Sequence, residues 1–259
     1  MAMTHDSAEL ARRFGGLDRL YGVAPAQAIA QAHVVVVGIG GVGSWTAEAL
    51  ARSGVSRLTL IDMDHIAESN INRQVHALTD TLGMAKGQAM QARIAQIHPG
   101  CQVDWIDDFV TPDNVQRLLP ASIDAVVDAC DDVPAKLALM RWARTQRVPH
   151  VCVGAAGGKR QPQRVEVADL ALVTHDPLLA KLRYRLRRED GAPRDGRPLQ
   201  VACVFSREAV APPDPSCALG NDGSLNCHGY GSSVTVTATF GLCAAAHAIE
   251  EVVRRSKKA

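Results

Sequence analysis

The segment from residue 34 to residue 74 constrains the fold more than any other part of the chain. It begins with four valines at 34–37, a run that predicts a strand buried on both faces. An alanine-rich helix follows, and the turn before it contains Gly38, Gly40, Gly41 and Gly43. Glycine lets a phosphate approach the backbone, and the N–H groups and dipole of a helix start favour its charge. The pattern therefore predicts a nucleotide phosphate at the start of this helix.

Two acidic residues follow the second expected strand, which covers residues 57–61. Asp62 and Asp64 lie about 20 residues after the glycine turn, where an acid usually binds the ribose hydroxyls. This half of the pattern also fits an ordinary NAD- or FAD-binding domain. An NAD-dependent oxidoreductase is therefore one function that the segment allows.

The polar turn that comes next favours ATP over a dinucleotide. Residues 69–74 read SNINRQ, and Lys86 follows twelve positions later. Arg73 and Lys86 are cations that would flank an additional phosphate, and a dehydrogenase has no physical need for them. The arrangement suits ATP, whose α-phosphate must be made electrophilic.

With these residues the chain resembles the adenylating enzymes of the ubiquitin-activating, MoeB and ThiF superfamily. The resemblance covers roughly residues 10–160. The matching words, in the family's order and spacing, are GIGGVG at 38–43, DMD at 62–64, SNINRQ at 69–74, GMAK at 83–86 and DACDD at 128–132.

Within the superfamily the chain is most similar to the tRNA threonylcarbamoyladenosine dehydratases, the TcdA or CsdL subgroup. The words that carry this likeness are RFGGLDRLYG at 13–22, VGAAGGKRQP at 153–162 and TVTATFG at 235–241. The resemblance implies an enzyme that uses ATP to adenylate the threonyl carboxylate of threonylcarbamoyladenosine in tRNA. The activated acyl group then closes into a ring, which gives cyclic threonylcarbamoyladenosine.

The resemblance also implies a role for each matching residue. The ATP-binding set is Gly38, Gly40, Gly41, Gly43, Asp62, Asp64, Asn70, Arg73, Gln74 and Lys86. Within it, Gly41 would let the backbone approach the phosphates, and Asp62 would bind the ribose. Asn70, Arg73 and Lys86 would grip the phosphates. Asp131 would hold Mg²⁺, which usually binds one or two carboxylates together with phosphate oxygens.

An arginine near the start of the chain implies a homodimer. By resemblance, Arg13 corresponds to a catalytic arginine that reaches into the active site of the partner subunit. The opening is longer than the RYxRQ pattern of MoeB-type proteins, so Arg19 competes for this role. Partners of the cysteine desulfurase type, which deliver sulfur, are associated with the family.

The order of elements predicts a Rossmann-like, doubly wound α/β fold. Strands alternate with helices through the first two thirds of the chain, which indicates a mainly parallel sheet with helices on both faces. The carboxyl ends of such strands form the ligand edge, and Gly38, Asp62 and Asp128 all follow strand ends. We expect strands at 33–37, 57–61, 102–106, 123–127, 149–153, 163–168 and 199–205, and helices at 8–31, 41–53, 84–97, from 111, 133–146, 175–188 and 233–255.

We divide the chain into three parts: an N-terminal helical segment at 1–32, an ATP-binding adenylation core at 33–160, and a C-terminal extension at 161–259. The extension contains a basic helix, a long polar loop at 206–231 and a terminal helix. The candidate tRNA-binding cations of the basic helix are Lys181, Arg183, Arg185, Arg187 and Arg188, and Arg254, Arg255, Lys257 and Lys258 could extend the patch. A solvated helix face would show the same pattern. The apolar run at 233–249 is shorter than the roughly 20 residues of a membrane span, so we expect a buried core helix.

Composition points to a cytoplasmic protein. The chain has 259 residues, a net charge of +1 and seven cysteines, and it opens without a signal-peptide pattern. The cysteine count is odd and no two are spaced as Cys-x-x-Cys, so we expect neither a disulfide framework nor the zinc site of many MoeB and ThiF relatives. Cys217 and Cys227 lie in the long loop, where a thioester nucleophile could sit, although the dehydratase chemistry needs no thiolate.

Three other functions compete with the dehydratase. One is MoeB- or ThiF-type adenylation of the C-terminus of a ubiquitin-like sulfur carrier, against which the missing cysteine pairs weigh. The NAD-dependent oxidoreductase would leave Arg73, Lys86 and Asp131 without a role. A non-catalytic binding module is disfavoured because these three residues are intact.

Overall fold

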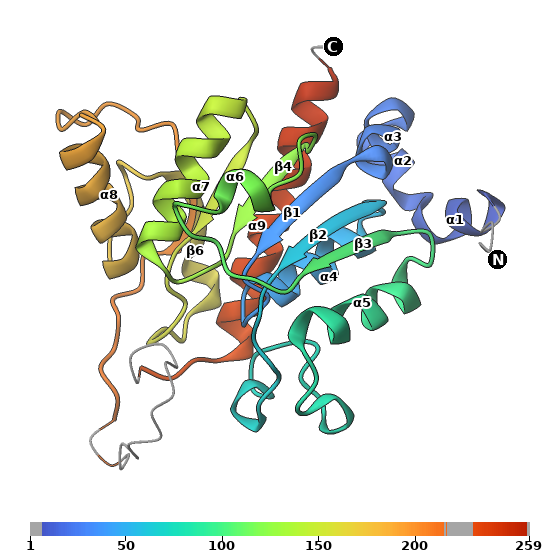
Figure 1. The fold of residues 1–259 in the computed structure, drawn as a ribbon, viewed down its shortest axis with the longest axis horizontal. Helices are drawn as coiled ribbons and strands as arrows, with labels where there is room; N and C mark the ends of the chain where they lie inside the picture. Colours follow the sequence, from blue (N-terminus) through green and yellow to red (C-terminus); the bar gives the residue numbers. More distant parts are fainter. Residues whose placement is uncertain (1–6, 215, 217–229, 258–259) are drawn as a thin grey trace.

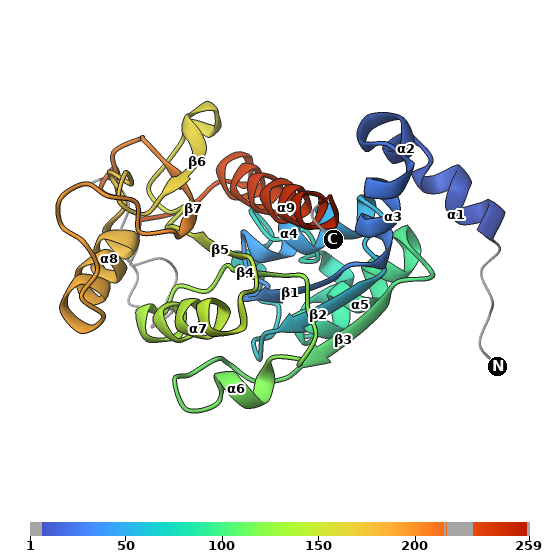
Figure 2. The same cartoon turned by 90° about the horizontal axis from the view of Figure 1, so that it is seen from above.

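The computed structural model describes residues 7–214, residue 216 and residues 230–257. Its centre is one seven-stranded sheet in the order β3-β2-β1-β4-β5-β7-β6 (Figures 1 and 2). All neighbouring strands are parallel except β6, which runs antiparallel to β7 at one edge. The strands are β1 (His33–Val37), β2 (Arg57–Ile61), β3 (Gln102–Ile106), β4 (Ala125–Asp128), β5 (His150–Val153), β6 (Val165–Asp169) and β7 (Ala202–Ser206). The predicted Rossmann-like fold is confirmed.

Helices cover both faces of the sheet. The helices are α1 (Ser7–Phe14), α2 (Gly16–Tyr21), α3 (Val23–Gln31), α4 (Gly43–Arg52), α5 (Lys86–Ile97), α6 (Val115–Leu118), α7 (Val133–Gln146), α8 (Pro177–Glu189) and α9 (Val234–Ser256). One face packs against α3, α4, α5 and α9, and the other against α6, α7 and α8 (Figure 2).

The valine run of β1 is buried on both faces, as the sequence predicts. Val34 and Val36 pack toward α4 and α9, whereas Val35 and Val37 pack toward α6 and α7. All four side chains are at most 3% exposed. Because successive side chains of a strand point to opposite faces, a strand covered on both sides needs apolar residues at every position.

The helix expected over residues 8–31 is divided into three. The breaks fall at glycines, with Gly15 between α1 and α2 and Gly22 between α2 and α3. Gly22 has a φ of 91°, a conformation that a residue with a Cβ rarely adopts. The chain therefore turns between these short helices before it enters β1.

Two elements begin three or more residues later than predicted. The backbone N–H groups of Leu199 and Val201 donate to the carboxylate of Asp169 at 2.8 and 3.2 Å, so the ladder of β7 starts only at Ala202. In the same way, the side chain of Asn114 accepts the N–H of Thr111 at 2.7 Å. That bond closes a turn where the sequence suggests a helix start, and α6 begins at Val115.

The C-terminal extension shares the sheet with the preceding core. It supplies β6 and β7, and a buried lysine attaches its loops. Lys159 is 2% exposed and donates to the carbonyl oxygens of His175, Ser206 and Glu208, each at 3.1 Å. Residues 153–162, whose sequence resembles the dehydratase subgroup, thus join the end of β5 to the start of α8 and to the segment after β7.

The apolar C-terminal helix packs against the body of the protein. α9 is long and apolar enough to cross a membrane by length and composition alone, and 56% of its most apolar window is buried. Val236, Phe240, Ala244 and Ala248 belong to the main core cluster with residues of α4 and β1. The predicted core helix is confirmed.

Candidate functional site

The glycine turn lies at the carboxyl edge of the sheet, between β1 and α4. Gly38 has a φ of 84°, and its N–H donates to the carbonyl of Ile61 at 2.9 Å. A Cβ at position 43 would lie 1.7 Å from the carbonyl oxygen of Gly38, so the turn can close only with glycine there. The chain thus reaches the first turn of α4 with its backbone accessible, as a phosphate site requires.

Asp62 joins the end of β2 to this turn. Its carboxylate accepts the N–H of Ile39 at 2.5 Å and the N–H of Asp64 at 2.8 Å. Burial raises the pKa of Asp62, although Lys86 and the two N–H donors act in the opposite direction. The carboxylate is therefore fixed beside the glycine turn, where an acid can accept ribose hydroxyls.

Lys86 is brought to the same edge as the first residue of α5. Its Nζ forms an ion pair with Asp64 Oδ2 at 2.6 Å, and its N–H donates to the Asp64 carbonyl at 2.9 Å. The lysine side chain is 8% exposed, whereas that of Asp64 is 66% exposed. The ammonium is thus held at the mouth of the site by a carboxylate that solvent reaches freely.

The SNINRQ motif forms a compact turn whose side chains hold its own backbone. Asn70 is buried and accepts the N–H of Ala67 at 3.1 Å. Arg73 Nη1 donates to the Ser69 carbonyl at 2.6 Å and to Asn72 Oδ1 at 3.0 Å. These bonds direct the arginine along the turn.

Gln74 presents an unsatisfied polar atom to the glycine turn. Its side chain is 5% exposed, and its Oε1 is without a hydrogen-bond partner among the described residues. Its Nε2 would lie 4.0 Å from a Cβ at Gly40. Because a buried amide oxygen normally has a partner, this atom indicates a place where a ligand supplies one.

Asp131 and Asp132 follow β4 at the same edge and differ in what they contact. Asp132 caps α7 by accepting the N–H of Ala135 at 2.8 Å. Asp131 is exposed. Asp132 is exposed too, so the two acids differ only in that Asp132 also caps the helix.

A buried ion pair that the sequence analysis missed lies under these acids. Asp128, the last residue of β4, pairs with Lys136 of α7 at 3.0 Å, and both side chains are 0% exposed. Lys136 Nζ also donates to the Val153 carbonyl at 2.8 Å, which ties β4 to β5. Desolvation alone would raise the pKa of Asp128, but Lys136, His150 and Cys130 together lower it to about 2. The one signal in the sequence was a lysine amid the apolar residues of α7.

Arg13 lies at the far end of α5 from Lys86. Its Nη1 donates to the carbonyl of Ile97, the last residue of α5, at 3.1 Å, and its guanidinium pairs with Glu9 at 2.7 Å. Residues 86 and 97 of one helix are about 16 Å apart along its axis. Arg19, its competitor, is exposed on α2. Within the chain, Arg13 is thus not placed at the glycine turn.

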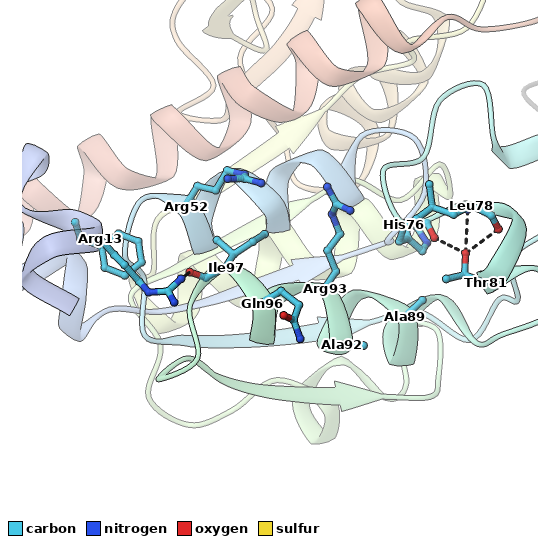
Figure 3. Close-up of a pocket in the computed structure, with 11 residues that line it drawn as sticks. Arg13, Arg52, His76, Leu78, Thr81, Ala89, Ala92, Arg93, Gln96 and Ile97 are labelled. Carbon is cyan, nitrogen blue, oxygen red and sulfur yellow. Dashed lines mark hydrogen bonds between the residues drawn. The ribbon is translucent and has the colours of Figure 1, made fainter. Parts of the chain in front are cut away.

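A cavity of about 620 Å³ runs between these two ends of α5 (Figure 3). It begins at Arg13, passes Arg52 and Arg93, and ends at His76 and Thr81. A second cavity, of about 1010 Å³, lies at the opposite edge of the sheet, beside His150 and the start of β7. Neither cavity is lined by the glycine turn, so the candidate nucleotide site is defined by its contacts.

The basic helix α8 uses most of its candidate cations within the chain. Arg183 donates to the carbonyls of Leu170 and Val173 at 2.9 and 2.8 Å. The others with local partners are Arg185, paired with Glu189 at 2.7 Å, and Arg187, bonded to the Pro193 carbonyl at 3.2 Å. Lys181 and Arg188 are exposed.

The remaining predicted residues lie apart from the glycine turn. Arg254 pairs with Glu251 on α9, and Arg255 and Lys257 are exposed near its end. Cys217, Cys227 and Lys258 lie outside the described residues. Within the described ranges, no group of three or more His, Cys, Asp or Glu side chains is arranged to hold a metal ion.

Comparison with known proteins extends the likeness to the whole chain. The ThiF family model matches residues 13–258. The tRNA threonylcarbamoyladenosine dehydratase of Escherichia coli is 45% identical over 95% of this chain and 96% of that protein. The enzyme of the same name from Haemophilus influenzae is 39% identical over 94% of each.

Solved structures agree. The E. coli dehydratase in complex with ATP matches with a TM-score of 0.88 and 45% identity, over 98% of both chains. Its complex with AMP matches with a TM-score of 0.89 and 44% identity over the whole of both chains. The chain thus shares this fold along its full length, and the shared part includes the glycine turn, the SNINRQ turn and Lys86. The chain belongs to the ThiF family.

Proposed function

We propose that this protein is an ATP-dependent tRNA threonylcarbamoyladenosine dehydratase. One observation carries the proposal: identity of 45% over nearly the full length of an E. coli enzyme of that name, which has been solved with ATP and with AMP. The geometry supports it. Asp62 and the Gln74 side chain lie beside the glycine turn, and Lys86 pairs with Asp64, two residues after Asp62.

ATP would bind across the carboxyl ends of β1 and β2. Asp62, fixed beside Ile39, would accept the ribose hydroxyls, and the first turn of α4 would face the phosphates. Gln74 Oε1 would gain a partner that the described part of the chain does not supply. Lys86 would turn from Asp64 to a phosphate oxygen, since Asp64 is exposed and water can solvate the carboxylate that Lys86 leaves.

The reaction would proceed in two steps. A carboxylate oxygen of the threonyl group attacks the α-phosphorus, the bond to the bridging oxygen breaks, and pyrophosphate leaves. Arg73 and Lys86 would stabilise the charge that develops on the phosphates. The carbamoyl nitrogen then attacks the acyl carbon and gives up its proton, and AMP departs with the former carboxylate oxygen. The nucleoside loses the elements of one water.

The second step needs no enzyme nucleophile. The attacking nitrogen and the acyl carbon belong to the same nucleoside, and intramolecular alignment can contribute about 7–11 kcal/mol. Among the described cysteines, burial raises the pKa of Cys130 well above its ordinary value, and Asp128 acts in the same direction. That thiol would stay protonated and unreactive.

The residues at this edge fit Mg²⁺. Mg²⁺ commonly binds one or two carboxylates and completes its shell with phosphate oxygens and water, so it needs no dedicated protein cage. Asp131 would hold it, because it is exposed and, unlike its exposed neighbour Asp132, does not cap α7. When bound, the ion would neutralise charge on the polyphosphate.

A homodimer would complete each site. Arg13 lies one helix length from Lys86 of its own subunit, so the arginine that acts beside the phosphates would come from the other copy. In a two-fold dimer each subunit would give one arginine and receive one.

The tRNA would meet a surface that includes α8. Lys181 and Arg188 are its exposed candidates for phosphate contacts, whereas Arg183 bonds the loop before the helix and Arg185 pairs with Glu189 of the same helix. A tRNA substrate agrees with a cytoplasmic protein. So do the five described cysteines, which are free thiols and suit a reducing environment.

A direct test uses the whole reaction. The protein is incubated with ATP, Mg²⁺ and tRNA that carries threonylcarbamoyladenosine, and the tRNA is digested and its nucleosides are weighed. An ATP-dependent loss of one water supports the proposal. An unchanged nucleoside, with pyrophosphate exchange stimulated by a sulfur-carrier protein, would replace it with the MoeB- or ThiF-type activity.

A further inference from the structure

Two of the three tryptophans donate their indole N–H to main-chain carbonyls of the candidate nucleotide site. Trp45 Nε1 donates to the carbonyl of Arg73 at 2.9 Å, and Trp105 Nε1 donates to the carbonyl of Asp62, also at 2.9 Å. Trp142, the third, is buried in α7, and its Nε1 is without a partner in the described part of the chain. The contrast sets the first two apart from a tryptophan that only fills the core.

Trp45 connects the phosphate-binding helix to the arginine turn. It lies in the first turn of α4, two residues after Gly43, and its neighbour Ser44 accepts the N–H of Val75 at 3.4 Å. Two successive side chains of α4 therefore hold the backbone on both sides of Gln74. This fixes the distance between the arginine turn and the helix start where the phosphates would lie.

Thr237 of α9 supports the same carbonyl from the other side. Its hydroxyl lies 3.4 Å from Arg73 O and equally far from Val234 O of its own helix, so the two carbonyls share one donor. Its methyl would lie 3.3 Å from a Cβ at Gly41. The stem of Arg73 would lie equally close to that Cβ. The arginine stem and the C-terminal helix thus meet on the glycine turn, so the position of Arg73 depends on packing from three separate segments.

Trp105 makes the corresponding contact to Asp62, the candidate ribose-binding acid. It lies in β3, and its indole bonds the backbone of Asp62 just beyond the last paired residues of β2 and β3. A Cβ at Gly87 would lie 2.2 Å from the indole, so the first turn of α5 rests directly on the ring. Lys86 precedes that glycine. One indole therefore fixes the carbonyl of the ribose-binding acid and supports the helix start that presents the lysine.

We propose that Trp45 and Trp105 are positioning residues that divide the nucleotide site between them, Trp45 for the phosphates and Trp105 for the ribose. The inference rests on the proposed function, because it takes the ligand to be ATP. Removing each N–H would then affect a different part of the nucleotide. Loss of the Trp45 bond would weaken ATP binding and spare adenosine, whereas loss of the Trp105 bond would weaken the binding of both.

The test measures the binding of ATP and of adenosine to Trp45→Phe, Trp105→Phe and the matched control Trp142→Phe, each in the full-length protein. Phenylalanine keeps an aromatic ring and removes the N–H. We expect Trp45→Phe to raise the dissociation constant of ATP about threefold to tenfold, the size expected for one hydrogen bond, and to leave that of adenosine near wild type. Trp105→Phe should raise both constants, and Trp142→Phe should raise neither.

Thr237→Val provides a second variant on the phosphate side, since it removes only the hydroxyl and keeps the shape of the side chain. It should follow Trp45→Phe in weakening ATP more than adenosine, and it keeps the inference testable if Trp45→Phe fails to fold. The positioning roles would be overturned if Trp45→Phe and Thr237→Val weakened the binding of ATP and of adenosine equally. They would also be overturned if the variants bound both ligands as tightly as Trp142→Phe does. Wild-type protein that binds neither ligand would instead overturn the proposed function.

Discussion

Removing the charge of Lys136 should destabilise the protein far more than removing any exposed lysine. Lys136 Nζ donates to Val153 O at 2.8 Å, to Asp128 Oδ1 at 3.0 Å and to Asp128 O at 3.3 Å, and both side chains are inaccessible to solvent. In Lys136→Met the carboxylate of Asp128 stays buried without its cation. Breaking a buried pair in this way costs about 3–5 kcal/mol of unfolding free energy.

A double-mutant cycle separates the ion pair from the packing. Asp128→Asn with Lys136→Met removes both charges and keeps the volume of both side chains. The double variant should be more stable than the sum of the two single effects by about 2 kcal/mol or more. Urea unfolding measures each free energy, with Lys181→Met as the exposed control. A cost below about 1 kcal/mol for Lys136→Met, or strict additivity in the cycle, would refute the reasoning.

The pH dependence should differ between wild type and Lys136→Met. In the wild type the pKa of Asp128 is held near 2, below its ordinary 3.8, so its contribution is present above about pH 4 and is lost as the pH falls toward 2. The variant should lose less stability over this range, because protonation of Asp128 removes the unpaired charge.

Three further predictions concern the site and its surroundings. His76 is 1% exposed, and both of its ring nitrogens are without partners among the described residues. Burial lowers its pKa to about 4. The protein should therefore lose about 3 kcal/mol of unfolding free energy as the pH falls from 6.5 to 4. His76→Gln should flatten that part of a pH series of urea midpoints, and an unchanged slope would exclude the histidine as its origin. In Gly43→Ala the added Cβ would overlap the carbonyl of Gly38. The variant should bind ATP at least about tenfold more weakly in calorimetry and should melt at a lower temperature. Near-wild-type binding would mean that the turn is not as tight as described. Arg13→Ala and Lys86→Ala should each be nearly inactive, yet an equal mixture of exchanged subunits should recover about a quarter of wild-type dehydration, since half of the dimers would be mixed and each would hold one intact site. No recovery, with mixed dimers shown to form, would contradict exchange of the arginine between subunits.

The sequence predicted the architecture because each local signal agreed with the global fold. The valine run of β1 and the glycines after it can satisfy their packing and backbone requirements only as a buried strand and a tight turn. The carboxyl edge followed from this, since residues after parallel strands share one edge. Asp62 lies at that edge beside the glycine turn, and its role in binding a nucleotide stays a prediction.

What the sequence could not show depended on contacts between distant segments. The partners of Lys136 could not be read from the residues around it, because β4 and β5 enclose its ammonium group only in the folded chain. Gly87 is not in a turn, and nothing in the local sequence explains why a glycine is needed there. The structure explains it, because the indole of Trp105 in β3 leaves no room for a Cβ at the start of α5. The sequence of α8 predicts one basic face, but Arg183 donates hydrogen bonds to carbonyls of the preceding loop. Such partners are set by packing, which no local pattern encodes.

Oxygen-18 in the threonyl carboxylate of the tRNA substrate tests the central claim most directly. If the carboxylate attacks the α-phosphorus and the ring then closes on the acyl carbon, one labelled oxygen must leave on AMP. Mass spectrometry of the nucleotides after one turnover should show AMP carrying the label, and unlabelled pyrophosphate. Label in inorganic phosphate or in water, with unlabelled AMP, would contradict adenylation of the carboxylate at this site.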